Sequence, residues 1–319
     1  RMKSLQILVA RDKINKNTMN IKPNYQKAYI LLLITSILWG IAPAIIKTGI
    51  NQINPIVFLF YRYLIASIPV LIYIIYSKNL ISSIKIIKSP KNILTMLCIT
   101  PLPLILIFSG MKYTTSIIAS VAGAFSPIVA TVMGAHFMKE KITKNEKIGT
   151  IIAFTGISLL SIIEQETNSV PMYQQILGVL LIMSNSFIWI WGGILYKKSN
   201  PKERDLLNLN SFLISVPLFI LIIFIANIPL NIDSISTSAW NSIFYMAILG
   251  TLVAFTTYQK AIEIIEVSEA NLFGYINPVF AIPAGIIIAG ETLNLSMIIP
   301  LIIIAIGIFI AIKEKMNIK

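Results

Sequence analysis

One stretch decides the fold, and it occurs twice: ASVAGAFSPIVATVMGAHFMKEKIT at residues 119–143 and ANLFGYINPVFAIPAGIIIAGETLN at residues 270–294. The copies lie 151 residues apart and match at residues with special backbone behaviour, whereas chance alignment of isoleucine-rich sequence would mostly match Ile to Ile. A duplication that places Pro and Gly at the same points of two apolar runs is typical of secondary transporters. The matched pairs are Gly123 and Gly274, Pro127 and Pro278, Gly134 and Gly285, and Glu140 and Glu291.

The composition excludes an ordinary soluble domain. Hydrophobic residues make up 56% of the chain and charged residues only 12%. The apolar residues gather in ten runs of about 20 residues, the length that crosses a bilayer core. We therefore expect an all-α integral membrane protein. The ten runs are residues 28–47, 55–76, 93–111, 115–138, 146–163, 176–196, 207–226, 240–260, 268–289 and 296–313.

The placement of basic residues accounts for the net charge of +13 and indicates the topology. Basic residues concentrate before the first run and in every second connection, whereas the opposite side holds only Lys47 and Lys112. Lys and Arg favour the cytoplasmic side of a membrane. We expect both termini in the cytoplasm, and we interpret the charge as a topology signal rather than a nucleic-acid site.

The duplication divides the chain into three parts. Residues 1–27 form a basic cytoplasmic tail, residues 28–163 form a first repeat of five helices, and residues 176–313 form a second. Because five is an odd number, the second repeat enters the membrane from the opposite side, so the repeats are inverted. Glu140 then ends its helix at the cytoplasmic face and Glu291 at the outer face.

The small residues of each copy share one helix face. Ala119, Gly123, Pro127, Ala130 and Gly134 are spaced by three or four residues, which keeps them on one stripe. Such a stripe lets another helix approach closely. Each proline also removes a backbone hydrogen bond to the glycine four residues earlier, which frees a carbonyl in the membrane. Simple packing kinks remain an equal alternative.

These residues resemble the EamA-type transporters of the drug/metabolite transporter superfamily. That family carries an early Trp-Gly, a Pro in the fourth helix and a following Glu in each half. An Arg in helix 2 and a Gly in each fifth helix complete the pattern. The matching residues are Trp39-Gly40, Pro55, Phe58, Arg62, Pro127, Glu140-Lys141-Ile142-Thr143 and Gly156, then Trp191-Gly192, Pro278, Glu291-Thr292-Leu293 and Gly307.

The resemblance covers residues 28 to 313 and implies an inverted-repeat solute carrier, often an exporter. It also implies a central cavity lined by helices 1, 3, 4, 6, 8 and 9. Two departures stand out: Asn294 replaces a second Thr, and the second half lacks the Arg.

Three charged residues are candidates for gating. Arg62 lies inside the second run, where an unpaired cation is costly. Its side chain either reaches the outer interface by snorkelling or serves as a gate or anchor at a cavity wall. For Glu140 and Glu291 we favour an interfacial role, bonding to the following loop or to Lys, over proton coupling.

Neutral polar and aromatic residues supply the candidate cavity. Amide and aromatic groups around one cavity suit an amino-acid-like or amphipathic solute. Helix-to-helix hydrogen bonds and interfacial Trp are the alternative explanations. A nucleotide sugar or other anionic metabolite is the second option, although polyanions favour several cations. The candidates are Trp39, Ser109, Ser120, Ser126, Asn185, Trp189, Tyr258, Asn271, Tyr275 and Asn277.

Other classes of protein fit less well. With His136 and Cys98 as its only histidine and cysteine, the sequence offers no catalytic cluster, metal site or cofactor site. It has no GxxxxGK[ST] loop for ATP, and no filter loop or charged ring of a channel. We expect a bacterial inner-membrane protein whose partners are the bilayer and a small-molecule solute, with no nucleic acid. A homodimer is left open.

Overall fold

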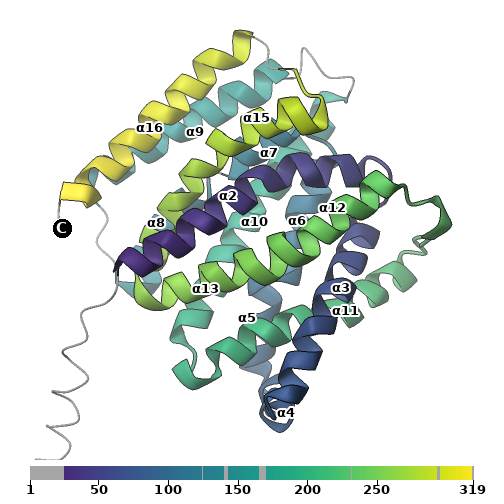
Figure 1. Cartoon of the computed structure of the whole chain (residues 1–319). Helices are drawn as coiled ribbons and strands as arrows, with labels where there is room; N and C mark the ends of the chain where they lie inside the picture. Colours follow the sequence, from purple (N-terminus) through teal and green to yellow (C-terminus); the bar gives the residue numbers. More distant parts are fainter. Residues whose placement is uncertain are drawn as a thin grey trace, which may run out of the picture.

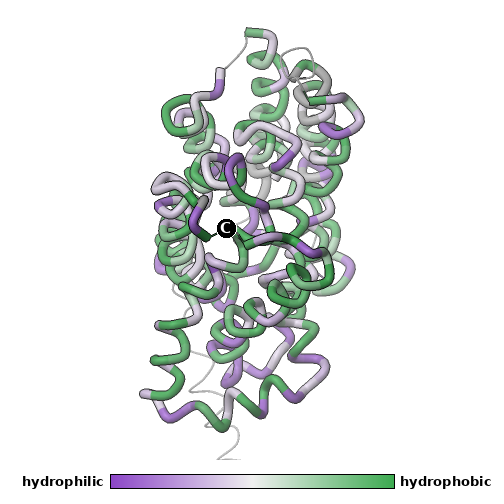
Figure 2. Tube along the Cα trace, turned by 90° about the vertical axis from the view of Figure 1, so that its right-hand side faces the viewer, coloured by the Kyte–Doolittle hydropathy of each residue, from purple (hydrophilic) through white to green (hydrophobic). Residues whose placement is uncertain are grey.

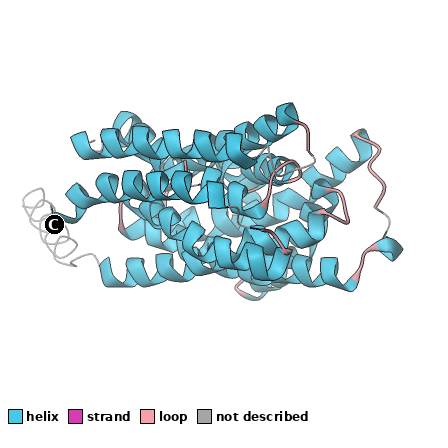
Figure 3. Cartoon of the chain, turned by 90° about the horizontal axis from the view of Figure 1, so that it is seen from above, coloured by secondary structure: helices cyan, strands magenta, loops and turns pink. Residues whose placement is uncertain are grey.

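The structure is a computed structural model that describes residues 25–123, 125–139, 143–164, 170–230, 232–292 and 295–317. Every regular element in these ranges is a helix (Figure 3). The expected basic tail lies outside the described residues, except that residues 25–27 already belong to the first helix.

The first half of the described chain runs from α2 to α9. α3 begins at Asn54-Pro55, where the Asn54 side chain accepts a hydrogen bond from the Ile56 amide (2.9 Å) and Pro55 lacks the amide that would need one. The helices are α2 (Tyr25–Ile50), α3 (Pro55–Tyr76), α4 (Leu80–Ile87), α5 (Pro90–Ile99), α6 (Pro101–Met111), α7 (Ser116–Gly123), α8 (Ser126–Met138) and α9 (Lys144–Glu164).

The second half runs from α10 to α16 and has the same kind of interruptions. A π-helical turn, η3, joins α12 to α13, and a 3-10 turn, η4, joins α14 to α15. The elements are α10 (Met172–Lys198), η1 (Pro201–Glu203), α11 (Arg204–Ile225), η2 (Ile232–Ser234), α12 (Thr237–Ala247), η3 (Ile248–Val253), α13 (Ala254–Ile264), α14 (Val267–Leu272), η4 (Phe273–Ile276), α15 (Asn277–Ala289), η5 (Leu295–Met297) and α16 (Ile298–Asn317).

Eight helical stretches of the described chain are long and apolar enough to cross a membrane. They coincide with eight of the ten apolar runs. Two shorter apolar stretches, one within α9 and one across η5 and the start of α16, lie where the other two runs were expected. The protein is therefore a multi-pass membrane protein. The eight stretches are Tyr25–Ile50, Pro55–Tyr76, Pro90–Met111, Ser116–Met138, Met172–Lys198, Pro201–Ile225, Thr237–Ile264 and Val267–Ala289.

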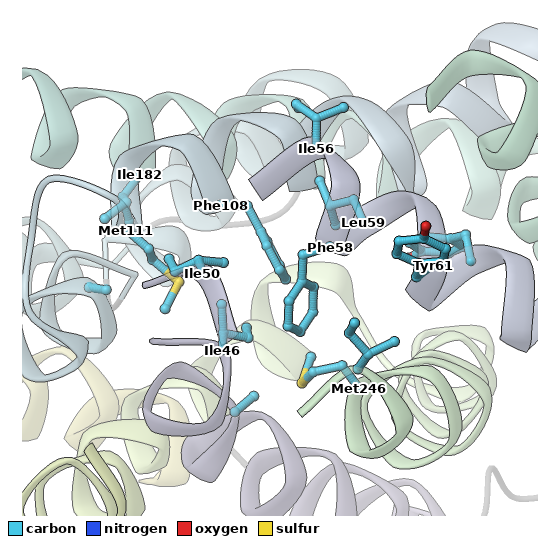
Figure 4. Close-up of a cluster of buried hydrophobic side chains, with 14 of the residues drawn as sticks. Ile46, Ile50, Ile56, Phe58, Leu59, Tyr61, Phe108, Met111, Ile182 and Met246 are labelled. Atoms are coloured by element: carbon cyan, nitrogen blue, oxygen red, sulfur yellow. The ribbon is translucent and has the colours of Figure 1, made fainter. Parts of the chain in front are cut away.

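The helices pack in pairs from different parts of the sequence. α9 lies along α16, and α3 lies beside α11 (Figure 1). A buried apolar cluster fills the space between α2, α3, α6 and α12, where the rings of Phe58 and Phe108 are 5.4 Å apart beside Met111 and Met246 (Figure 4). This core holds together helices from both halves of the chain.

The contacts between α9 and α16 are reciprocal. A methyl group added to Gly156 would meet Ile304 and the Pro300 carbonyl, and one added to Gly307 would meet Ala153 and the Gly149 carbonyl. Each member of one set lies 151 residues from its counterpart in the other, which is the offset of the duplication. The order of the contacts makes the two helices antiparallel. Glycine at both crossings permits the close approach.

The two copies of the repeated stretch also end in the same way. α8 ends at Lys139 in the left-handed conformation (φ 60°), and its amide donates to the Gly134 carbonyl. α15 ends at Gly290 (φ 67°), whose amide donates to the Gly285 carbonyl. A left-handed residue at this position satisfies the last carbonyls of a helix.

The outer surface of the bundle is apolar. Hydrophobic residues predominate along the helices, and hydrophilic stretches include the turns at the lower end of the molecule (Figure 2). Large side chains such as Ile72, Phe224, Ile287 and Phe309 are more than half exposed. A soluble protein would not leave so much apolar surface exposed, whereas lipid chains accept it.

Candidate functional site

A cavity lies between the helices of the two halves. It encloses about 1080 Å³ of empty space, part of it open to solvent. Its lining residues belong to α2, α3, α6, α7 and α8 of the first half and to α10, α12, α13, α14, η4 and α15 of the second. None of the described lining residues belongs to α9, α11 or α16. The lining elements belong to helices 1, 3, 4, 6, 8 and 9, which are the ones that the resemblance implies. One further residue comes from α3, the second helix.

Helix interruptions shape the wall of the cavity. α7 ends at Gly123 and α8 begins at Ser126, one residue before Pro127. At the same offset, η4 precedes α15, which begins at Asn277. A methyl group added to Gly123 would have no heavy atom within 4 Å, so this glycine faces open space. The repeated prolines therefore lie where both helices change geometry beside the cavity.

Eight of the ten neutral candidates line this cavity. Ser109 lies on α6, half-buried, and is not among the described lining residues. Tyr275 belongs to η4, but its side chain lies outside what the structure describes. The eight are Trp39, Ser120, Ser126, Asn185, Trp189, Tyr258, Asn271 and Asn277.

The polar groups of the cavity divide into paired and unpaired ones. Ser126 and Ser186 share a hydrogen bond between helices (2.7 Å), and the Asn271 amide donates to the Tyr258 hydroxyl (2.8 Å). In contrast, Ser120 Oγ and Asn277 Oδ1 are buried and have no hydrogen-bond partner in the part of the chain that the structure describes. These two oxygens come from equivalent regions of the two repeats, and both can accept a bond from a solute.

Four aromatic rings form a cluster on one side of the cavity. Trp39 lies 5.6 Å from Trp189, 5.2 Å from Phe255 and 5.5 Å from Tyr258, as measured between ring centroids. The Trp39 indole nitrogen donates to the Gly250 carbonyl (3.1 Å). Both tryptophans thus lie inside the bundle rather than at its membrane interface. Phe255 was missed from the sequence, although it precedes Tyr258 by three residues and so shares its helix face.

Arg62 does not snorkel to the interface. Its side chain is 1% exposed and lines the cavity. Nε donates to the Thr251 hydroxyl (2.7 Å) and Nη2 to the Gly250 carbonyl (3.3 Å). The π-helical turn η3 presents both acceptors, and the Thr251 hydroxyl in turn donates to the Met246 carbonyl (2.7 Å). In the second half, the residue that lies at the same distance before the proline inside its helix is Asn210 rather than an arginine.

Glu291 bonds to a helix of the other half. Its carboxylate accepts hydrogen bonds from the Ser116 amide (2.5 Å), the Ser116 hydroxyl (2.8 Å) and the Ile117 amide (3.1 Å). It thereby caps the N-terminus of α7, where a negative charge is favourable. The bonds described for Glu291 thus differ from the expected ones to the following loop or to Lys. Glu140 lies outside the described residues.

The rest of the described chain offers little alternative chemistry. No group of three or more His, Cys, Asp or Glu in the described residues could hold a metal ion. Cys98 is buried and free.

Comparison with known proteins identifies the family to which this chain belongs. The family described as the EamA-like transporter family matches twice, at residues 26–162 and 176–313. The chain belongs to the EamA-like transporter family. The family predicted from the repeated Gly, Pro and Glu residues is thereby confirmed. As an EamA-like chain, the protein is a membrane transporter in general terms.

Relatives of this EamA-like chain carry transporter names. It is 27% identical over 299 residues to a protein of Archaeoglobus fulgidus named "Uncharacterized transporter", with 91% of this chain and all of the relative covered. It is 22% identical to "Uncharacterized transporter YyaM" of Bacillus subtilis, with 89% of this chain and 92% of the relative covered.

A solved structure shares the fold. It is titled "Crystal structure of protein" and aligns with a TM-score of 0.67 over 92% of this chain and 99% of its own, at 16% identity. At that identity the likeness concerns the fold alone.

Proposed function

We propose that the protein is a secondary transporter of small organic metabolites that works by alternating access, as an exporter or exchanger of amino-acid-like or amphipathic solutes. One observation carries the proposal. A cavity within helices of membrane-spanning length is lined by both repeats and holds neutral polar groups, aromatic rings and a single charge. Such a lining binds an organic solute without fixing it permanently.

The arrangement of the two halves supports alternating access. We propose ten transmembrane helices, with α9 and α16 as helices 5 and 10, arranged as two inverted five-helix repeats. The reciprocal contacts of Gly156 and Gly307 and the matching helix ends at Lys139 and Gly290 support this arrangement. Inverted repeats can exchange conformations, which moves the opening from one side of the membrane to the other.

The orientation rests on the distribution of positive charge. Basic residues concentrate before α2 and in alternate connections, which favours cytoplasmic termini. We propose a bacterial inner membrane as the location.

The cavity favours amino-acid-like solutes over nucleotide sugars, the second candidate class. Arg62 is the only Lys or Arg among the described lining residues. A diphosphate would leave charge uncompensated beside one guanidinium, because phosphate sites normally combine several cations or backbone donors.

Flux through reconstituted protein tests the proposal. Purified protein in liposomes is given amino acids, nucleosides and amphipathic amines, with and without a pH gradient. The matched variants are Gly123→Leu, which fills the cavity, and Thr155→Leu, which adds the same side chain on the exposed face of α9.

We expect saturable flux of one solute class, abolished by Gly123→Leu and kept by Thr155→Leu. Absence of saturable flux from folded protein would contradict a carrier, and ionic conductance in its place would favour a channel. Loss of flux with a change in pH gradient would indicate proton coupling.

A further inference from the structure

The starting observation is a buried cation without an anion. Arg62 is 1% exposed, and its hydrogen bonds go to a hydroxyl and a carbonyl. The ion pair found in the described part of the chain joins Lys260 to Asp205 instead, outside the cavity. No Asp or Glu occurs among the described lining residues. The cavity therefore has a net positive wall.

The neighbouring groups compensate this charge only in part. The guanidinium carbon lies 5.3 Å from the centre of the Tyr63 ring, 5.6 Å from that of Phe108 and 5.9 Å from that of Phe255. Ring faces attract a cation, but less strongly than a full negative charge does. Removing an ion from water is costly, so a full anionic partner would stabilise Arg62 more than the rings do.

One end of the guanidinium is free to take such a partner. Nε and Nη2 are held by the π-helical turn, whereas Nη1 is buried with no hydrogen-bond partner among the described residues. Nη1 carries two N–H donors, and an unmet buried donor is costly. The turn also fixes the orientation, because the Gly250 carbonyl accepts from both Trp39 and Arg62.

Arg62 is part of the wall of the cavity. Arg62 lines it together with Phe108, Met246 and Phe255. Nη1 is covered by neighbouring side chains in this conformation, so a bound anion requires some of them to move. These three side chains are apolar and can move without breaking side-chain hydrogen bonds.

We propose that Arg62 binds the carboxylate of the transported solute through Nη1, so that the substrate is a small organic monocarboxylate, free amino acids included. This inference rests on the proposed function and narrows it. The carboxylate compensates the buried cation, while the aromatic cluster around Trp39 takes the apolar part of the solute. Amphipathic amines without a carboxylate are rejected, because they would add a second positive charge to the cavity.

A comparison of matched ligands tests the inference on the wild-type protein. Binding of leucine against leucinamide and of hexanoate against hexanamide is measured by quenching of tryptophan fluorescence, since Trp39 and Trp189 line the cavity. Within each pair, one ligand carries a carboxylate and the other carries a neutral amide in its place. We expect the carboxylates to bind roughly 10- to 100-fold more tightly than the amides.

Variants then assign the effect to one residue. Arg62→Gln removes the charge from the cavity, and Lys112→Gln removes a charge from an exposed residue outside the cavity lining. Arg62→Gln is expected to remove the preference for the carboxylate, and Lys112→Gln to leave it intact. Equal binding of carboxylate and amide by the wild type would overturn the inference, even if Arg62→Gln does not fold.

Flux separates this inference from the proposed function. Saturable flux of solutes without a carboxylate, with no carboxylate preference, would overturn the role of Arg62 and leave the transporter. Carboxylate binding that depends on Arg62, without flux of any solute, would support the site and contradict the transporter.

Discussion

Replacing Glu291 by Ala is expected to destabilise the protein, because this carboxylate caps α7. Two amides and one hydroxyl donate to it at 2.5–3.1 Å. A hydrogen bond to a charged group contributes about 1.5–3 kcal/mol, but the site is only partly buried and water can replace part of the loss. We therefore expect a loss of about 2–4 kcal/mol, or a fall of about 4–10 °C in the melting midpoint.

The assay is thermal unfolding in detergent, followed by intrinsic tryptophan fluorescence. Glu291→Gln keeps one acceptor oxygen, so its midpoint should fall between those of the wild type and Glu291→Ala. Glu266→Gln is the matched control, because Glu266 precedes α14 but its side chain makes no capping bond. Equal midpoints for Glu291→Ala and Glu266→Gln would refute the capping role.

Four further substitutions test other parts of the account. Lys139→Gly should raise stability by about 0.5–1 kcal/mol, because Lys139 has φ 60° and glycine accepts this conformation without strain. Gly307→Val should lower the stability by about 1–3 kcal/mol, because an added Cβ would lie 2.5 Å from the Ala153 nitrogen. The melting midpoint measures the effect of both substitutions. Gly274→Leu and Pro278→Ala should reduce liposome flux more than the folded fraction, because both residues lie at the interruption beside the cavity.

Each kind of substitution has a control substitution elsewhere in the chain. Gly290→Lys should do the opposite of Lys139→Gly, since Gly290 has φ 67°. Gly123→Ala should leave stability nearly unchanged, because its added methyl group has space. Pro300→Ala on α16 should affect flux less than Pro278→Ala. A stabilising Gly290→Lys, a destabilising Gly123→Ala or equal flux losses for the two prolines would each contradict the structural reasoning.

The sequence was sufficient to predict the helices because long apolar runs have few alternatives in a membrane. The interruption at Pro127 was also predictable, since proline lacks the amide that continues a helix. The π-helical turn at Ile248–Val253 was not. It depends on contacts of the Gly250 and Thr251 region with Arg62 and Trp39, which come from distant segments.

The hydrogen-bond partners of the charged residues could not be predicted from the sequence, for the same reason. Glu291 bonds to Ser116, which lies 175 positions earlier in the chain. Arg62 could be placed inside a helix by its position, but whether it reached the interface depended on how α3 packs against α12 and η3. Eight of the ten neutral candidates chosen by residue type and depth line the cavity, whereas their hydrogen bonds required the fold.

Accessibility of one cavity position tests alternating access most directly. Gly123→Cys in a Cys98→Ser background places a single thiol where the cavity wall is open, since Cys98 is the only natural cysteine. Its reaction with a membrane-impermeant thiol reagent is measured in right-side-out and in inside-out vesicles. The account predicts labelling from each side, slowed on both sides by a bound solute. Labelling from one side alone, in folded protein, would contradict it.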